Sequence, residues 1–290
     1  MDRLCPRSLE GGSVHRRVFL WFQAALVSVL VLAGLTGCGG SPSGSGSGAE
    51  GQEQGGTLTV LAASSLTDAF GELGRTFEEQ NAGVRVKQSF GASSDLLAQI
   101  QQGAPADVFA SAAQEEMDTA MKDGLVAGKS EVFVKNREVV MVPRDNPANI
   151  GSLSDLAEPD VKLVLAQKDV PAADYALEIL DKANAEYGSG FEKDVLSNVV
   201  SRESDVRASV NRVVVGDADA TFGYASDYTP DIRDRAKVIP IPPDLNIIAT
   251  YPIATLEDAK DPELAKKLVD LVTGKQGQRV LKKWNLEPAA

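Results

Sequence analysis

The chain has 290 residues, of which 41 are acidic and 29 basic, giving a formal net charge of −12 at pH 7. Such an acidic surface argues against nucleic acid or an anionic membrane surface as a binding partner. The single histidine (His15) and both cysteines (Cys5 and Cys38) lie in the first 38 residues, so the remainder cannot hold a His-based triad, a Cys nucleophile, a disulfide or a thiolate or imidazole metal site.

The N-terminal segment predicts export and lipid anchoring. Arg16 and Arg17 precede an apolar run from Val18 to Leu35, the order found in a secretory signal. Leu35-Thr36-Gly37-Cys38 resembles the lipobox of bacterial lipoproteins. We therefore expect residues 1–37 to be a lipoprotein signal peptide and Cys38 to carry the lipid, which would hold the protein on the outer face of the cytoplasmic membrane. The twin arginine leaves Sec and twin-arginine export both open.

A flexible tether is expected next. Residues 38–56 are rich in glycine and serine and cannot bury apolar surface. Because residues 1–37 carry four arginines and two carboxylates, their removal leaves a net charge of −14. An anionic ligand would then have to be held by local dipoles, since the overall field repels it.

From Thr57 onward, short β-rich runs alternate with amphipathic helical patterns, which is typical of an α/β fold with parallel strands. The strands are expected at 57–63, 84–89, 107–110, 139–142, 162–165, 220–224 and 247–251. The helices are expected at 66–79, 94–102, 114–123, 173–184, 205–214, 262–273 and 274–284.

Two extended stretches, 138–143 and 238–252, could carry the chain between two lobes. The first lobe would then comprise residues 57–138 plus 250–290, and the second residues 139–249. Each lobe would be a mainly parallel sheet flanked by helices. Ligands of such sheets bind outside the carboxyl ends of the strands, so we expect the ligand in the cleft between the lobes.

Four strand-to-helix junctions carry candidate binding groups: Ser64-Ser65, Ser93-Ser94, the segment around Ala172 and the segment around Val206. Helix N-termini present unpaired N–H groups and the positive end of the helix dipole, so they can bind an anion without a cation. Taken singly, each serine is more often a helix N-cap than a ligand. Tyr224, at the end of an expected buried strand, is likewise more often a packing residue.

These segments resemble, in order, the motifs of the bacterial molybdate-binding protein family. The matching motifs are Ala62-Ala63-Ser64-Ser65-Leu66-Thr67, Phe90-Gly91-Ala92-Ser93-Ser94, Gly103-Ala104-Pro105-Ala106-Asp107-Val108-Phe109, Asp169-Val170-Pro171-Ala172, Asp205-Val206-Arg207 and Phe222-Gly223-Tyr224-Ala225-Ser226-Asp227. The similarity runs from Thr57 to about Pro288. Ser64 departs from the family, which often has alanine there, and Gly91-Ala92 before Ser93 is a second departure.

The resemblance implies a type II periplasmic-binding-protein fold and a binding component of an ABC transporter, monomeric, with a permease and its ATPase as partners. It implies no catalytic residue and no cofactor, and a metal bound only as its oxyanion. The implied ligand residues are Ser65 and Ser93 from the first lobe and Ala172, Val206 and Tyr224 from the second. Ser64 and Ser94 are secondary candidates, because which serine of each pair points inward stays open.

A site made only of donors suits a fully ionised tetrahedral dianion such as molybdate or tungstate, which the sequence does not separate. Hydrogen phosphate carries a proton that needs an acceptor, and sulfate must be rejected by the size of the site. A receptor for sulfate or another oxyanion is the main alternative. Ferric iron held by Tyr224 and Tyr228 and a Ser-based transferase are weaker alternatives. The affinity and the anion's coordination number stay open.

Overall fold

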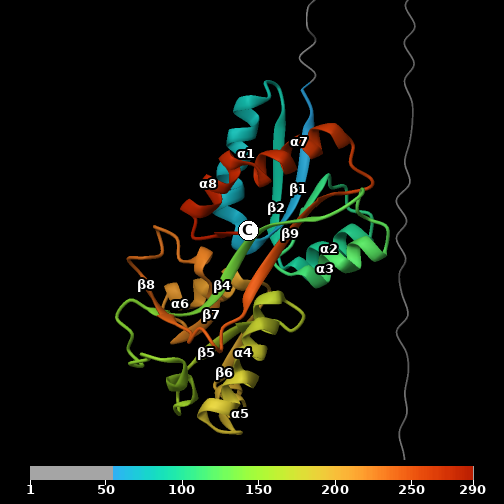
Figure 1. Ribbon diagram of the computed structural model, residues 1–290. Helices are drawn as coiled ribbons and strands as arrows, with labels where there is room; N and C mark the ends of the chain where they lie inside the picture. The colour runs from blue at the N-terminus through green and yellow to red at the C-terminus, as the bar shows by residue number, and fades with distance from the viewer. Residues whose placement is uncertain (1–54, 290) are drawn as a thin grey trace, which may run out of the picture. The chain divides into compact units, whose positions relative to one another are not determined.

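The structure is a computed structural model that describes residues 55–289. The expected signal peptide, the lipid attachment site at Cys38 and most of the expected tether therefore lie outside the described residues. The described chain forms an α/β fold of two lobes connected by long strands (Figure 1). Between Gly55 and Ala289, no helix is long and apolar enough to cross a membrane.

The strands form one continuous ladder of pairing in the order β2-β1-β3-β9-β4-β7-β5-β6, with β8 and β10 also pairing with β4. Their bounds are β1 (Thr57–Ala63), β2 (Arg85–Gly91), β3 (Val108–Ala110), β4 (Glu131–Pro143), β5 (Leu163–Ala166), β6 (Val199–Glu203), β7 (Ala220–Tyr224), β8 (Ala236–Pro240), β9 (Ile248–Thr255) and β10 (Glu287–Pro288).

The helices are α1 (Thr67–Gln80), α2 (Ser93–Gln101), α3 (Gln114–Lys122), α4 (Pro171–Tyr187), α5 (Phe191–Ser197), α6 (Val206–Val214), α7 (Pro262–Thr273) and α8 (Lys275–Lys283). Short 3-10 turns are η1 (Ser64–Leu66), η2 (Leu153–Ala157) and η3 (Ala225–Asp227). Most helices follow a strand directly, so their N-termini lie at the carboxyl ends of the strands, where such folds bind ligands.

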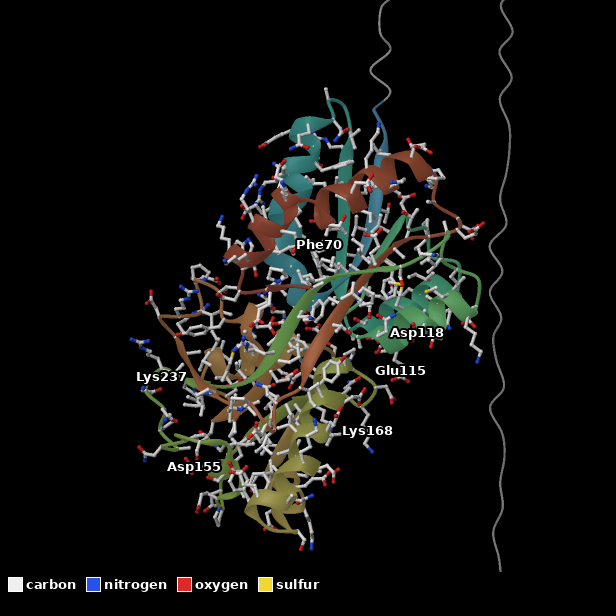
Figure 2. All side chains as sticks on the ribbon, viewed as in Figure 1. Phe70, Glu115, Asp118, Asp155, Lys168 and Lys237 are labelled. Carbon is white, nitrogen blue, oxygen red and sulfur yellow. The ribbon has the colours of Figure 1, made fainter. Side chains whose placement is uncertain are left out.

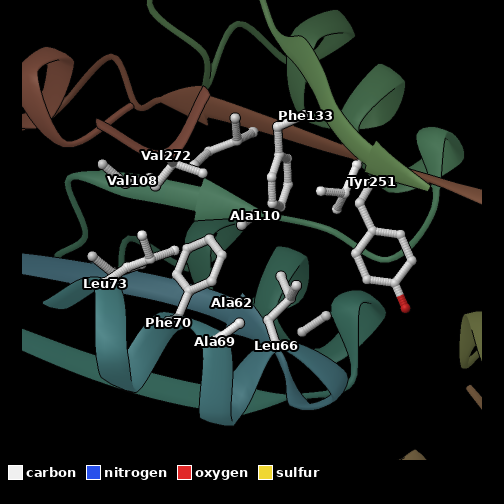
Figure 3. Close-up of a cluster of buried hydrophobic side chains, with 14 of the residues drawn as sticks. Ala62, Leu66, Ala69, Phe70, Leu73, Val108, Ala110, Phe133, Tyr251 and Val272 are labelled. Atoms are coloured by element: carbon white, nitrogen blue, oxygen red, sulfur yellow. The ribbon is translucent and has the colours of Figure 1, made fainter. Parts of the chain in front are cut away.

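The first lobe is built on three parallel strands. β1 pairs in parallel with both β2 and β3, and β9 closes this group in the antiparallel direction. Phe70 and Leu73 of α1 are fully buried because the apolar face of that amphipathic helix lies on the sheet. Figure 3 shows this cluster, with Phe70 facing Phe133 and with the hydroxyl of Tyr251 directed away from the apolar side chains.

The second lobe has its own apolar core. β5 pairs in parallel with β6 and β7, and α4 covers them with Ile179 and Leu180, both fully buried. Figure 2 shows Phe70 inside the first lobe, while the charged side chains of Asp118, Lys168 and Lys237 lie at the periphery. The two cores are therefore separate bodies of apolar side chains.

β4 and β9 connect the lobes. Residues 131–137 of β4 pair with β9 and residues 138–143 pair with β7 and β8, all in the antiparallel direction. The expected strand at 139–142 is thus only the second half of a strand of 13 residues. The lobes therefore share a continuous pair of strands here.

The expected fold class is confirmed, and most expected elements lie within three residues of those observed. The expected elements do not include α5, β6, β8 and β10, and the expected helix at 66–79 begins at the last residue of η1. α5 is only 7 residues long, and β6 is 5 residues long and half exposed, so each is too short to show a sustained apolar pattern in the sequence.

Candidate functional site

A small cavity lies where the two lobes meet. It is lined by Ala63, Ser64, Ser65, Ala92, Ser93, Ala112, Val170, Pro171, Ala172, Val206 and Tyr224, and it encloses about 10 Å³ in which the centre of a water molecule fits. The lining comes from the four expected strand-to-helix junctions, the end of β7 and Ala112. Five residues named from the sequence (Ser65, Ser93, Ala172, Val206 and Tyr224) are therefore neighbours around one cavity.

The first lobe contributes two fully buried serines whose hydroxyl groups do not cap helices. Ser65 Oγ lies 2.9 Å from the hydroxyl oxygen of Tyr251. Ser93 Oγ accepts a hydrogen bond of 2.9 Å from the backbone N–H of Ala112. Since η1 and α2 have no side-chain cap, the capping role that is commonest for a serine at such a position is not seen for either residue.

The second lobe contributes two helix N-termini and a tyrosine. α4 begins at Pro171 after Val170 and has no side-chain cap, so the N–H of Ala172 lies in an uncapped first turn at the cavity. α6 begins at Val206, and its cap Asp205 accepts from Ala208 N at 3.1 Å rather than from Val206. Ala172 and Val206 thus stand in first turns, where backbone N–H groups have no partner within the helix, and both line the same cavity.

Tyr224 is the most informative of these groups. Its side chain is 1% exposed, and its hydroxyl is buried with no hydrogen-bond partner among the described residues. Burial, together with the neighbouring Tyr251 hydroxyl and Glu138 carboxyl, raises the pKa of Tyr224 well above its usual value. The phenol is therefore a neutral donor. A buried unpartnered polar group is costly, so a ligand acceptor at the cavity would satisfy it.

No charged side chain of the described residues lines the cavity. Arg207 follows Val206, but its guanidinium is used by Asp227 and Asp68, with N–O distances of 2.6 Å to each. Burial raises the pKa of Glu138, whose carboxyl oxygens have no partner in the described chain, well above its usual value. The groups that face the cavity are therefore hydroxyl and backbone N–H donors, which suit an anion and not a cation.

Hydrogen bonds join the lobes beside the cavity. Arg207 Nη2, at the start of α6, bonds Asp68 Oδ2 in the first turn of α1. Ser226 Oγ donates to the backbone oxygen of Ser65 at 3.2 Å. Ala172, Val206 and Tyr224 also pack against the apolar cluster of the first lobe. The lobes are therefore in contact around the cavity.

Ser64 and Ser94 separate in the structure. Ser64 is 6% exposed and lines the cavity, whereas Ser94 is half-buried on α2 and does not. Tyr228 lies elsewhere, with the Arg233 guanidinium 5.6 Å from its ring centroid, so it does not join Tyr224 in a tyrosinate pair. Nor does any group of three His, Cys, Asp or Glu residues within 55–289 form a metal site. Nothing in the geometry favours ferric iron.

Several residues at the site were not identified from the sequence. Tyr251 and Asn136 lie on strands β9 and β4 and are fully buried. Their sequence neighbourhoods carry no motif, so only their contacts with Ser65 and Ser226 reveal them. Asp227 and Arg207 stand in quoted motifs, but a sequence gives no sign that they pair.

A larger cavity of about 510 Å³ lies away from these junctions and includes Tyr228, Arg233, Lys282 and Asn285 in its lining. It is an open surface groove, and Arg137 in its wall is already paired with Glu287. The small cavity, with buried polar groups from both lobes around it, is therefore the candidate functional site.

Comparison with known proteins agrees with this placement of the chain among binding proteins. Residues 58–286 match the family described as bacterial extracellular solute-binding protein. The molybdate-binding protein of Mycobacterium tuberculosis is 34% identical over 268 residues, covering 91% of this chain and 96% of the relative. A putative ABC transporter substrate-binding lipoprotein of Bacillus subtilis is 30% identical over 91% of this chain and 95% of its own length.

Solved structures share the fold. The substrate-binding domain of a putative molybdenum ABC transporter from Clostridium difficile has a TM-score of 0.60 and 27% identity, over 81% of this chain and 100% of that one. The sulfate-binding protein of Mycobacterium tuberculosis has a TM-score of 0.70 and 19% identity, over 80% and 87%. At that lower identity the second comparison speaks for the fold alone.

Proposed function

This chain belongs to the bacterial extracellular solute-binding proteins, in the family of the molybdate-binding proteins, and we propose that it captures molybdate or tungstate and delivers the anion to an ABC permease and its ATPase. One observation carries the proposal: neutral donors from both lobes converge on a single cavity, and the hydroxyl of Tyr224 there has no partner among the described residues.

Each lining residue has a distinct role in the proposal. Ser65 and Ser93 donate their hydroxyl hydrogens, Ala172 and Val206 donate backbone N–H groups, and Tyr224 donates its phenolic hydrogen. Ser64 is a secondary donor because it lines the same cavity. Ser94, which does not line it, becomes the weakest candidate. The metal is bound only as part of its oxyanion, with no catalytic step and no cofactor.

The chemistry of the donors selects the ligand class. A dianion with four acceptor oxygens satisfies every donor, whereas a protonated anion presents a hydrogen that meets no acceptor, at a cost of roughly 1–3 kcal/mol. Sulfate has the right charge but is smaller than molybdate, so the protein must discriminate against it by the spacing of the donors around the cavity. A receptor for sulfate is the second candidate, favoured by the shared fold of a sulfate-binding protein.

Closure of the lobes would complete the site. We take residues 57–138 plus 250–290 as one moving body and 139–249 as the other, because β4 and β9 pass between separate apolar cores at these points. Binding between the lobes would favour the closed arrangement, shield the donors from water and form the surface that the permease contacts.

The protein would act outside the cytoplasm as a monomer tethered by lipid. Residues 1–37 would be removed on export, Cys38 would carry the lipid and residues 38–56 would form the tether. The relative from Bacillus subtilis, itself described as a lipoprotein, supports this arrangement. Contact with the membrane would be through the lipid only.

Calorimetric titration of the compact unit Gly51–Ala290 with molybdate, tungstate, sulfate and phosphate tests the function. We expect tight one-to-one binding of the first two and none of the others. Binding of sulfate with equal affinity would favour the general oxyanion receptor. Absence of binding by all four anions would refute the proposal.

A further inference from the structure

The hydroxyl of Tyr251 lies directly behind Ser65. Tyr251 is fully buried, and its oxygen has two polar neighbours: Ser65 Oγ at 2.9 Å and Asn136 Nδ2 at 3.2 Å. The ring of Tyr251 packs edge-on against Tyr224, with 5.8 Å between the ring centroids. Tyr251 is not in the cavity lining, so it can influence a ligand only through Ser65 or Tyr224.

The amide of Asn136 has a definite orientation. Its Nδ2 donates to Ser226 Oγ at 2.9 Å and to the Tyr251 hydroxyl, and its Oδ1 accepts from the backbone N–H of Arg137 at 3.1 Å. Exchanging the amide nitrogen and oxygen would place Nδ2 against the N–H of Arg137, donor against donor. The amide therefore presents hydrogens to Tyr251.

This orientation fixes the hydrogen of Tyr251. Because its oxygen accepts from Asn136, and Ser65 Oγ is its other neighbour, full satisfaction requires Tyr251 to donate to Ser65. Ser65 Oγ then accepts from Tyr251 and its own hydrogen is free to point into the cavity. Ser226, the second acceptor of Asn136, uses its hydrogen on the backbone oxygen of Ser65.

We propose that Asn136 and Tyr251 form a relay that makes Ser65 a donor toward the ligand and so selects oxyanions that carry no proton. Neither residue touches the anion, so both are specificity-determining positioning residues. The proposal rests on the proposed function and adds to it the reason why an intrinsically two-way hydroxyl presents only a hydrogen. Ser93 is held in a similar way, because its oxygen accepts from Ala112 N.

The test uses two dianions of similar size that differ in one hydrogen. At mildly alkaline pH, where both are dianions, selenate has four acceptor oxygens, whereas hydrogen arsenate has three and a hydroxyl group. Each is measured by its displacement of molybdate from the purified protein. The wild-type protein should prefer selenate.

Asn136→Asp reverses the relay. An oxygen in place of Nδ2 would accept from Tyr251, Tyr251 would then accept from Ser65, and a lone pair of Ser65 would face the cavity. Selenate loses a donor and hydrogen arsenate gains an acceptor, so the preference for selenate should fall about tenfold. The new charge opposes both dianions equally and cancels from the ratio. Asn211→Asp, on an exposed part of α6, is the matched control and should leave the ratio unchanged.

Tyr251→Phe separates the relay from other effects of the substitution. In the Tyr251→Phe background, Asn136→Asp should change the selenate preference by less than about twofold, because no hydroxyl remains to transmit the change. A second measurement does not depend on the folding of the aspartate variant. Tyr251→Phe should weaken molybdate binding several-fold when Ser65 is present and have no further effect in a Ser65→Ala background.

The outcomes distinguish a failure of the proposed function from a failure of the relay alone. If the wild-type protein binds neither molybdate nor tungstate, the proposed function is wrong. If it binds molybdate, the relay is overturned by a folded Asn136→Asp variant with the wild-type ratio, by an equal shift in the Tyr251→Phe background, or by additive effects of Tyr251→Phe and Ser65→Ala.

Discussion

The hydroxyl group of Tyr224 is the strongest single indication that the cavity holds a ligand. Its hydroxyl is buried and unpartnered within the described chain, while its backbone N–H donates to Asp227 Oδ2 at 3.0 Å. A polar atom kept in this state lowers stability without a ligand and raises affinity with one. The same atom therefore connects the stability of the free protein to binding.

Tyr224→Phe should lower molybdate affinity about tenfold and leave the ligand-free protein as stable or up to about 1 kcal/mol more stable. Calorimetry and urea unfolding measure the two effects on the same samples. Tyr187→Phe, which removes a hydroxyl at the end of α4, serves as the control. Loss of stability with unchanged affinity would show that the hydroxyl of Tyr224 has a structural partner instead.

Glu116 gives a prediction for pH. It is 9% exposed in the first turn of α3, and burial raises its pKa from 4.5 to about 7, with smaller contributions from the charges of Glu115 and Asp174. The folded state therefore favours the protonated carboxyl. Stability from this group is full below pH 4.5 and is lost as pH rises toward about 7.

Glu116→Gln should remove that loss. Relative to the wild-type protein, the variant should gain stability between pH 4.5 and about 7, by about 3 kcal/mol. Urea unfolding of both proteins across this range gives the difference. A difference that is constant with pH would mean that the carboxyl titrates alike in the folded and unfolded chains.

At the scale of elements, two helices with aspartate N-caps can be compared, one at the cavity and one away from it. α6 and α7 each begin after an aspartate cap: Asp205 accepts from Ala208 N at 3.1 Å, and Asp261 accepts from Leu264 N at 2.9 Å. Of these two helices, α6 reaches the cavity through Val206 and α7 does not. The two caps therefore form a natural pair, one at the site and one away from it.

Asp205→Ala and Asp261→Ala should each cost about 1 kcal/mol of folding free energy, the usual value of an N-cap. Only Asp205→Ala should also weaken molybdate binding, because fraying of the first turn moves the N–H of Val206. Thermal unfolding and calorimetry compare the pair. Equal loss of affinity in both variants would show that the N-terminus of α6 does not bind the ligand.

Elements with a clear apolar periodicity can be predicted from the sequence, whereas short or irregular elements cannot. The burial of Phe70 and Leu73 on one face of α1 follows from their spacing, and β1 was expected at its observed bounds. β4 was predicted at less than half its length, because its first residues, Glu131 to Arg137, alternate charged and apolar groups irregularly. Pairing with β9 makes this segment a strand, which is a tertiary effect.

At the scale of the whole molecule, Arg207 forms an ion pair between the lobes. Its guanidinium bonds buried Asp227 in its own lobe and Asp68 on α1 in the other. The carboxyl of Asp68 is 31% exposed, so the contact between lobes is only partly shielded from water. Such a pair is strong enough to bias closure and weak enough to break.

Asp68→Asn should speed molybdate dissociation and lower affinity about fivefold, since an ion pair of about 1 kcal/mol is lost from the closed form only. Stopped-flow measurement of the off-rate tests this. Asp118→Asn, on the exposed side of α3, is the control. An unchanged off-rate would mean that the Arg207–Asp68 pair does not stabilise the closed form and that the other contacts between the lobes do.

The sequence by itself determined the fold class, the family and the candidate donors at four strand-to-helix junctions, because these depend on local periodicity and on motifs that stay contiguous. It left open which serine of each pair faces inward. The structure places Ser64, Ser65 and Ser93 at the cavity and Ser94 outside it, which depends on how each turn enters its helix.

Only the tertiary structure decided which partners stand behind those donors. Tyr251 is 186 residues from Ser65, Asn136 is 90 residues from Ser226, and Asp68 is 139 residues from Arg207. Contacts of this range arise from the strand order of the sheet and from the approach of the two lobes, and no local pattern encodes them. The direction of a hydroxyl hydrogen is set by these distant neighbours.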